Sequence, residues 1–207
     1  MSLLRLRARR SGVVVVAFMV CAALNTYAQS GWTTAFEDDF ESGETLKWIL
    51  EEGWDLGQDS SSVLKGEGSA NAAVPLADMW RNYAVSFKFK LIQGQFDFIF
   101  RNREFPPLAT YDKYMLLVGG EGIRLRKHKG HLETDDIPLT TMSYGFEIGQ
   151  WYELGVICKD AYIDVYVDGQ PILSFRDSDN PLFVGQFAFF LVEDTIVHLD
   201  DVEVRSE

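Results

Sequence analysis

Hydrophobic and polar residues alternate with a period of two along much of the chain. In residues 84–91, Val, Phe, Phe and Leu at odd-numbered positions alternate with Ser and Lys, and in residues 95–101 three phenylalanines alternate in the same way. Side chains of a β-strand point to opposite faces in turn, so this period predicts strands with one buried face. No segment keeps the 3.6-residue period of an amphipathic helix over three turns.

Residues 151–176 are the clearest unit and predict a meander of three strands. The first alternating run ends at Lys159 and Asp160, and the second ends at Asp168 and Gly169. Asp-Gly favours a two-residue type I′ turn, because both central residues need positive φ. Further short strands are expected over residues 114–118, 123–127, 185–192 and 195–204.

The last predicted strand changes phase. Val197 and Leu199 have odd numbers, whereas Val202 and Val204 have even numbers. A regular strand cannot bury both sets on one face. One extra residue at Asp200 and Asp201 would restore the phase, so the sequence predicts a β-bulge there.

Together the pattern predicts about ten to twelve short strands, with no internal repeat and no domain linker. Two irregular stretches interrupt it: residues 53–71, expected to be an exposed loop with a brief strand, and residues 104–110, a second loop. Many short strands joined by polar turns are typical of a sandwich or barrel. We expect one all-β domain over residues 32–207, a two-sheet antiparallel jelly-roll sandwich.

The first 28 residues have a different composition. Four arginines precede an apolar run over residues 12–24, and Thr26 and Ala28 suit positions −3 and −1 of a cleavage site. This layout is typical of a secretory signal peptide, and the run is shorter than the about 20 apolar residues of a membrane span. We predict cleavage after Ala28, a secreted or periplasmic mature protein, and no membrane insertion after cleavage.

Charge narrows the choice of partner. The formal net charge of −12 becomes −16 without the first 28 residues, which hold four arginines and no acidic residue. Nucleic acids and anionic lipids need a cationic face, so neither is an expected partner. Cys21 would leave with the signal peptide, which excludes a disulfide framework and favours Cys158 as a buried apolar side chain.

The order of these features resembles the laminin G-like and related jelly-roll domains of the concanavalin A-like lectin/glucanase superfamily. The resemblance rests on the acidic and aromatic opening at residues 36–41, on Trp48 and Trp54, on the unit at residues 151–169, and on the ending at residues 199–204. Members include lectins, sugar-binding modules, glycoside hydrolases and adhesion domains. The resemblance therefore implies a fold and leaves the function open.

The acidic opening has two functional interpretations. Its E-x-D-x-E spacing resembles the catalytic strand of laminarinase-type hydrolases, although those enzymes carry the motif in mid-domain. In jelly-roll sugar-binding modules the first and last strands pair, so Glu37 and Asp39 could instead hold structural calcium together with Asp200 or Asp201. Calcium takes six to eight oxygen ligands, some of them backbone carbonyls that a bulge exposes. The alternative is that these acids cap turns and face solvent.

A sugar site needs an aromatic plate with polar groups at its rim. Outward positions of several predicted strands supply such groups, and these would form one concave face if the strands are neighbours. Arg101 is the first choice, because an arginine that closes a run of phenylalanines should be held in place. The other candidates are Asp97, Arg124, Arg126, Tyr162, Asp164 and Tyr166, beside Lys88 and Lys90. The alternative is an ordinary solvated surface, with core or rim packing for Trp48, Trp54 and Trp151.

The expected function is a secreted, non-catalytic domain that binds a glycan or cell-surface polysaccharide. One alternative is a glycoside hydrolase, laminarinase-like or similar to the 3-keto-disaccharide hydrolases, and a second is an adhesion or envelope assembly subunit. An enzyme should show carboxylates with split pKa values in a cleft. A lectin should show an aromatic and polar groove, and an adhesion domain an apolar patch of several hundred Å².

Overall fold

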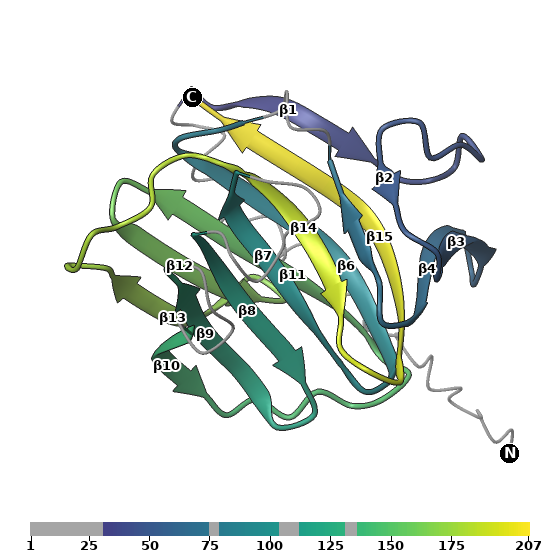
Figure 1. Ribbon diagram of the computed structural model, residues 1–207. Helices are drawn as coiled ribbons and strands as arrows, with labels where there is room; N and C mark the ends of the chain where they lie inside the picture. Colours follow the sequence, from purple (N-terminus) through teal and green to yellow (C-terminus); the bar gives the residue numbers. More distant parts are fainter. Residues whose placement is uncertain (1–30, 75–78, 104–111, 131–135) are drawn as a thin grey trace, which may run out of the picture.

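Two antiparallel β-sheets face each other in the computed structural model, which describes residues 31–74, 79–103, 112–130 and 136–207 (Figure 1). The predicted signal peptide and the loop at residues 104–110 lie outside the described residues. Within the described parts there are fifteen strands and no helix. The predicted all-β sandwich is therefore confirmed, with more strands than expected.

Each sheet has a continuous order of strands. Sheet A has the order β13 (Gln170–Arg176), β12 (Tyr162–Val167), β11 (Trp151–Lys159), β6 (Tyr83–Gln93), β15 (Thr195–Ser206), β4 (Ser62–Gly68), β3 (Trp54–Gln58), and β1 (Thr33–Asp38) also pairs with β15. Sheet B has the order β10 (Asp136–Met142), β9 (Gly122–His128), β8 (Lys113–Gly119), β7 (Gln95–Asn102), β14 (Gln186–Leu191), β5 (Asn71–Ala73), β2 (Ile49–Leu50).

The core lies between the two sheets and is rich in phenylalanine. The odd-numbered apolar residues of β6 are all buried, as the alternation predicts. Phe87 of β6 lies with its ring centroid 4.8 Å from Phe189 and 5.0 Å from Phe98, both in sheet B. Aromatic rings prefer such edge-on and tilted contacts, which here join one sheet to the other.

The predicted bulge is confirmed. The pairing of β15 with β6 shifts register between Asp200 and Glu203, and Asp201 has a φ of 47°. Before the bulge β15 pairs with β4, and after it β15 pairs with β1, while β6 stays on its other side. The phase change of the sequence thus marks the point where β15 exchanges one neighbour for another.

The Asp-Gly turn is also confirmed, with φ of 48° at Asp168 and 72° at Gly169. The expected loop at residues 53–71 is wrong, because β3 and β4 form a hairpin there. Its glycines have a packing role: a Cβ on Gly66 would lie 2.7 Å from the Trp54 ring. Trp48 and Trp54 pack in the core, in agreement with the packing alternative.

Candidate functional site

The sequence-predicted ligand-binding residues do not share one face. Asp97, Arg124 and Arg126 lie on strands β7 and β9 of sheet B, whereas Tyr162, Asp164 and Tyr166 lie on β12 of sheet A. The outward sides of the two sheets are opposite faces of the sandwich. The expected single concave face is therefore wrong, because period-two alternation tells inside from outside but does not tell which strands are neighbours.

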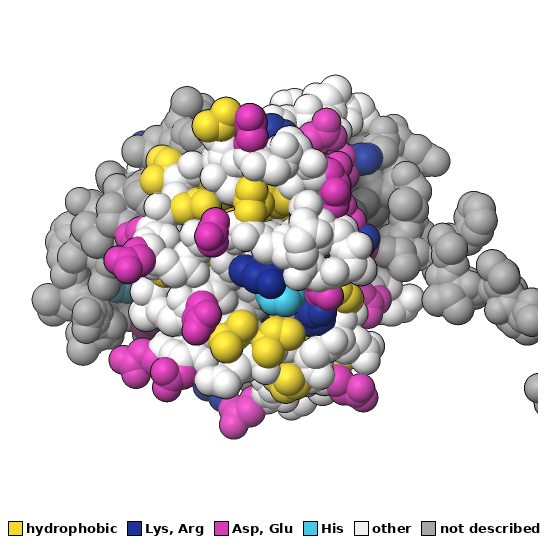
Figure 2. Space-filling view, turned by 90° about the vertical axis from the view of Figure 1, so that its right-hand side faces the viewer, with side chains coloured by type: hydrophobic (Ala, Val, Ile, Leu, Met, Phe, Trp, Pro, Cys, Tyr) yellow, Lys and Arg dark blue, Asp and Glu magenta, His cyan; other side chains and the backbone are white. Residues whose placement is uncertain are grey.

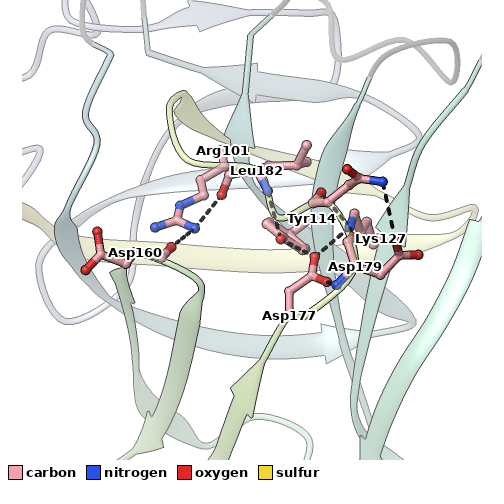
Figure 3. Close-up of polar contacts among 8 residues, drawn as sticks. Arg101, Tyr114, Lys127, Asp160, Asp177, Asp179 and Leu182 are labelled. Carbon is pink, nitrogen blue, oxygen red and sulfur yellow. Dashed lines mark hydrogen bonds and ion pairs between the residues drawn. The ribbon is translucent and has the colours of Figure 1, made fainter.

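Arg101 lies on neither face. Its φ of 50° and a register shift against β14 turn its side chain into the end of the sandwich, where it is fully buried (Figure 3). Its Nη1 donates to the carbonyl oxygens of Asp160, at 2.6 Å, and Leu182, at 2.5 Å. The prediction that Arg101 is held in place is confirmed, but its contacts are those of a structural clamp between the sheets rather than of a ligand-binding group.

The outer face of sheet B holds a chain of charged side chains, which we name the Arg126 network. Nδ1 of His128 lies 2.8 Å from Oδ1 of Asp136, and Oδ2 of Asp136 accepts a hydrogen bond from Nη1 of Arg126 at 2.9 Å. Nη2 of Arg126 donates to both carboxylate oxygens of Asp97 at 2.7 Å. Lys113 lies opposite His128 in the register of β8 and β9.

Much of the Arg126 network is buried although it lies on the outside of the sheet. Asp97, Lys113 and His128 are 5%, 4% and 1% exposed, while the side chains of Arg126 and Asp136 remain partly open to solvent. Burial raises the pKa of Asp97, against the opposing charge of Arg126. Burial also lowers the pKa of Lys113, against the attraction of Asp136 and Asp97. Buried charges are costly unless paired, so such an arrangement is typical of functional sites.

Several buried polar atoms on this face have no hydrogen-bond partner in the described structure. They are Nε2 of His128, Nε of Arg126 and both side-chain amide atoms of Gln186 on β14. Next to them lies a buried apolar floor of four residues on the same face: Ala73, Ile99, Met115 and Ala188. Buried polar groups are nearly always hydrogen-bonded, so these exceptions call for an explanation.

The other predicted binding residues have ordinary surface contacts. Arg124 pairs with Glu121, three residues away, and both are well exposed. Tyr162 is 48% exposed and lies under the Arg176 guanidinium, 5.7 Å from its ring centroid. Tyr166 packs beside the small cluster that includes Trp32. A ligand-binding role for Asp164 and these residues stays a prediction.

The acids predicted to bind calcium are engaged separately. Asp200 accepts a hydrogen bond from Ser61 at 2.9 Å, and Asp201 pairs with Lys88 at 2.5 Å. Oδ1 of Asp39 accepts from the backbone N–H of Glu41, and the backbone carbonyl of Glu37 accepts from Lys47. Among the described residues, no three His, Cys, Asp or Glu side chains form a group that could hold a metal ion. Calcium binding stays a prediction.

The acidic opening does not form the strand face that the laminarinase-type interpretation requires. Strand β1 ends at Asp38, and Phe40 has a φ of 56°, so Glu37, Asp39 and Glu41 do not alternate along one strand. Asp38 instead accepts hydrogen bonds from the backbone N–H of Phe40 and from Nε1 of Trp48. Asp38 therefore caps the turn, as in the alternative that these acids cap turns.

Sequence reasoning missed His128, Lys113 and Asp136 as site residues. Asp136 begins β10, an edge strand that contains Pro138 and has no clean alternation of burial. Proline is tolerated on edge strands, where its missing N–H is not needed. The sequence holds no period-two signal that would have placed this strand beside β9.

No protein-family model matches the chain, and no curated protein matches it in sequence. Solved structures do match. A protein of unknown function with a galectin-like fold, from Bacillus subtilis, is 14% identical, with 84% of this chain and 98% of that one covered and a TM-score of 0.68. A carbohydrate-binding module from Bacillus subtilis is 13% identical, with 77% and 96% covered and a TM-score of 0.60. A family 16 glycoside hydrolase from Bacteroides ovatus is 12% identical, with 82% and 99% covered and a TM-score of 0.64.

These domains match over nearly their whole length and share two facing antiparallel sheets with this chain. The chain has the concanavalin A-like fold. The predicted resemblance is thereby confirmed. The concanavalin A-like fold hosts binding and catalytic domains alike, so function has to be argued from the site. In the parts of the chain that the structure describes, nothing forms a helix of the length and hydropathy of a membrane span.

Proposed function

We propose that this domain binds carbohydrate on the outer face of sheet B, and that it does so as a secreted protein. The unpartnered buried polar atoms beside the Arg126 network carry the proposal. Sugar hydroxyls donate and accept hydrogen bonds, so they can satisfy an amide such as Gln186, an imidazole nitrogen and a guanidinium N–H together. The buried apolar residues beside these atoms give an environment of low polarity, in which such hydrogen bonds are stronger than in water.

Similar structures give further support. The neighbours include a carbohydrate-binding module, a family 16 glycoside hydrolase in complex with a product, and domain 4 of an extracellular arabinanase in complex with arabinotriose. The sequence-based expectation of a glycan partner rests on the resemblance to jelly-roll sugar-binding domains. The acidic net charge adds that nucleic acid is a poor partner.

A hydrolase is the second candidate, and one observation favours it. Two carboxyl groups, Asp97 and Asp136, contact the same guanidinium, and burial raises the pKa of Asp97. A buried carboxyl with a raised pKa beside a second carboxyl is the arrangement of an acid and base pair. In that case the wild-type protein releases reducing sugar from the glycan it binds, and Asp97→Asn does not.

Gln186→Leu tests the proposed binding site without a charge change. The Gln186 amide makes no hydrogen bond within the described structure, so we expect unchanged or higher stability for the variant. Affinity for the glycan identified on an array should fall about tenfold or more, since each lost hydrogen bond to a buried group costs about 1–3 kcal/mol. Gln170→Leu, on the exposed edge strand β13, is the matched control.

Two outcomes would contradict the proposal. If Gln186→Leu binds the glycan with wild-type affinity, the site is not on this face of sheet B. If the folded wild-type protein binds no glycan on the array and releases no reducing sugar from polysaccharides, carbohydrate binding itself is wrong.

A further inference from the structure

We propose that the outer face of sheet A is a second carbohydrate-binding surface, for a neutral glycan, so that the domain is bivalent. We name it the Trp151 surface. It shares no residue with the Arg126 network and lies on the opposite face of the sandwich. It is formed by six residues of three neighbouring strands: Trp151 and Glu153 of β11, Lys88 and Lys90 of β6, and His198 and Asp200 of β15.

Strand register places these side chains in two parallel rows. Lys90 is paired with Trp151 on one side and with His198 on the other. Lys88, two residues away and so on the same face, is paired with Glu153 and Asp200. Each row crosses three strands that lie about 4.8 Å apart, which gives regularly spaced polar groups across the middle of the sheet.

Trp151 provides an aromatic plate at one end of a row. Its side chain is half-buried on the outside of the sheet, so it does not belong to the core. Nζ of Lys90 lies 5.2 Å from its ring centroid, and the His198 ring lies 6.4 Å away at an angle of 49°. A cation over the ring and a neighbouring imidazole fix the indole in place. A pre-fixed aromatic ring loses little entropy when it stacks on a ligand.

The turn between β3 and β4 encloses the other end of the rows. Asp59 pairs with Lys90 and lies 3.3 Å from Nδ1 of His198, so its side chain reaches across β15 to β6. Ser61 of the same turn donates to Asp200. Figure 2 shows a face on which cationic, histidine and hydrophobic side chains gather among acidic ones. The Trp151 surface therefore has a plate, a polar floor and a bordering turn.

The mixture of charges selects the kind of ligand. Lys88 pairs with Asp201 and Lys90 with Asp59, and Glu153 and Asp200 flank Lys88 in the register, so donors and acceptors alternate on this face. Neutral sugar hydroxyls both donate and accept, so they suit such alternation. An anionic glycan would meet these carboxylates and a chain of formal net charge −12. Burial lowers the pKa of His198 against the hydrogen bond to Asp59, and the charges of Lys65 and Lys90 act in the same direction as burial.

Trp151→Ala separates this surface from the one on sheet B. The probes are soluble mixed-linkage β-glucan and arabinan, with polygalacturonate as the acidic comparison, in affinity electrophoresis and light scattering. Wild-type protein should be retarded by a neutral polymer and should cross-link it, because two faces bind at once. We expect Trp151→Ala to bind about tenfold or more weakly, as for a tryptophan at a binding hot spot, and to lose cross-linking.

Phe183→Ala is the matched control. It removes an aromatic ring that also lies near a cation, with Arg81 5.1 Å away, but Phe183 lies in the segment before β14. It should cross-link like the wild type, and thermal unfolding should show that all three proteins are folded. Polygalacturonate should retard none of them.

The outcomes distinguish the two proposals. Cross-linking by Trp151→Ala at the wild-type level overturns the second surface and leaves the sheet B site standing. No cross-linking by a wild type that binds a neutral polymer overturns bivalency, and the two variants then show which face binds. If Gln186→Leu alone loses binding, the Trp151 surface is wrong, and if Trp151→Ala alone loses binding, the sheet B site is wrong. Failure of the wild type to bind any neutral polymer overturns both, and retardation by polygalacturonate alone overturns the neutral ligand.

Discussion

Nζ of Lys127 lies 2.6 Å from Oδ2 of Asp177, and both side chains are almost completely buried (Figure 3). The hydroxyl of Tyr114 donates to the same oxygen at 2.6 Å, and the backbone N–H of Asp179 donates to the other at 2.9 Å. Lys127 also donates to the carbonyl oxygens of Asp179 and Asn180. These contacts fasten the segment that leaves sheet A after β13 to strands β8 and β9 of sheet B.

Asp177→Asn should destabilise the domain by about 3–5 kcal/mol, because it leaves the ammonium of Lys127 buried without its counter-charge. Urea unfolding of the wild type and the variant measures this difference. Asp179→Asn is the matched control, since the Asp179 carboxylate is exposed and contacts only the Asn180 amide in the described structure. Equal unfolding midpoints for Asp177→Asn and the wild type would contradict the assignment.

The advantage of the wild type over Asp177→Asn should also depend on pH. Burial acts to raise the pKa of Asp177, but hydrogen bonds from Lys127, Tyr114 and the Asp179 N–H together hold it below its ordinary value of 3.8. A carboxylate with a lowered folded-state pKa stabilises the fold above its unfolded pKa, and this contribution is lost as the pH falls further. The difference in unfolding free energy should therefore be constant near pH 7 and shrink below pH 3.8. A difference that grows on acidification contradicts this.

Arg101→Met should reduce stability without removing glycan binding. It leaves the carbonyl oxygens of Asp160 and Leu182 without their donor, which should cost about 3 kcal/mol. Because the Arg101 guanidinium is already engaged by the carbonyl oxygens of Asp160 and Leu182, the folded variant should bind the same glycans as the wild type when assayed well below its melting temperature. Lost binding by a fully folded variant would restore Arg101 as a ligand-binding residue.

Two substitutions at Asp201 test the bulge. The φ of 47° suits glycine but strains a β-branched residue, so Asp201→Val should destabilise by about 1–2 kcal/mol. Asp201→Gly removes the same half-exposed ion pair with Lys88, which is worth about 0–1 kcal/mol, without the backbone strain. Thermal melts of the two variants should thus separate the cost of backbone strain from the cost of losing the ion pair. Equal melting temperatures for the two variants would argue against the left-handed conformation.

Cys158 should be inert in the folded protein. It is fully buried, and burial raises the pKa of its thiol to about 12, so almost no thiolate is present near neutral pH. A thiol reagent at pH 8 should label it only in denaturant. Rapid labelling of the native protein, with unfolding excluded by circular dichroism, would contradict this burial.

Local features of the fold could be read from the sequence. The apolar faces of β6 and β7, the type I′ turn and the bulge each depend on residues close together in the chain, and all are confirmed. Which strands belong to which sheet could not be predicted in this way. Asp97 and Arg126 meet diagonally across β8, and such pairing between non-adjacent strands leaves no trace in local alternation.

The site was predictable only in part for the same reason. Asp97 and Arg126 were found as outward polar residues, but the irregular edge strand β10 hid Asp136, and with it the anchor of His128. The direction of the Arg101 side chain was predicted wrongly, because its left-handed backbone turns the side chain away from the face that alternation assigns to it. Trp151 was predicted to pack in the core or at the rim, because a sequence does not show whether the first residue of a strand is covered by the other sheet.

The place of β15 has a consequence for how the chain is made. This strand is the last of the domain to emerge from the ribosome, yet it lies in the middle of sheet A, between β6 and the strands β4 and β1. Until it is synthesised, three parts of that sheet have no strand to join them: β6 with β11–β13, the β3–β4 hairpin, and β1. The nascent domain therefore has unpaired strand edges until this strand is made, and such edges favour aggregation.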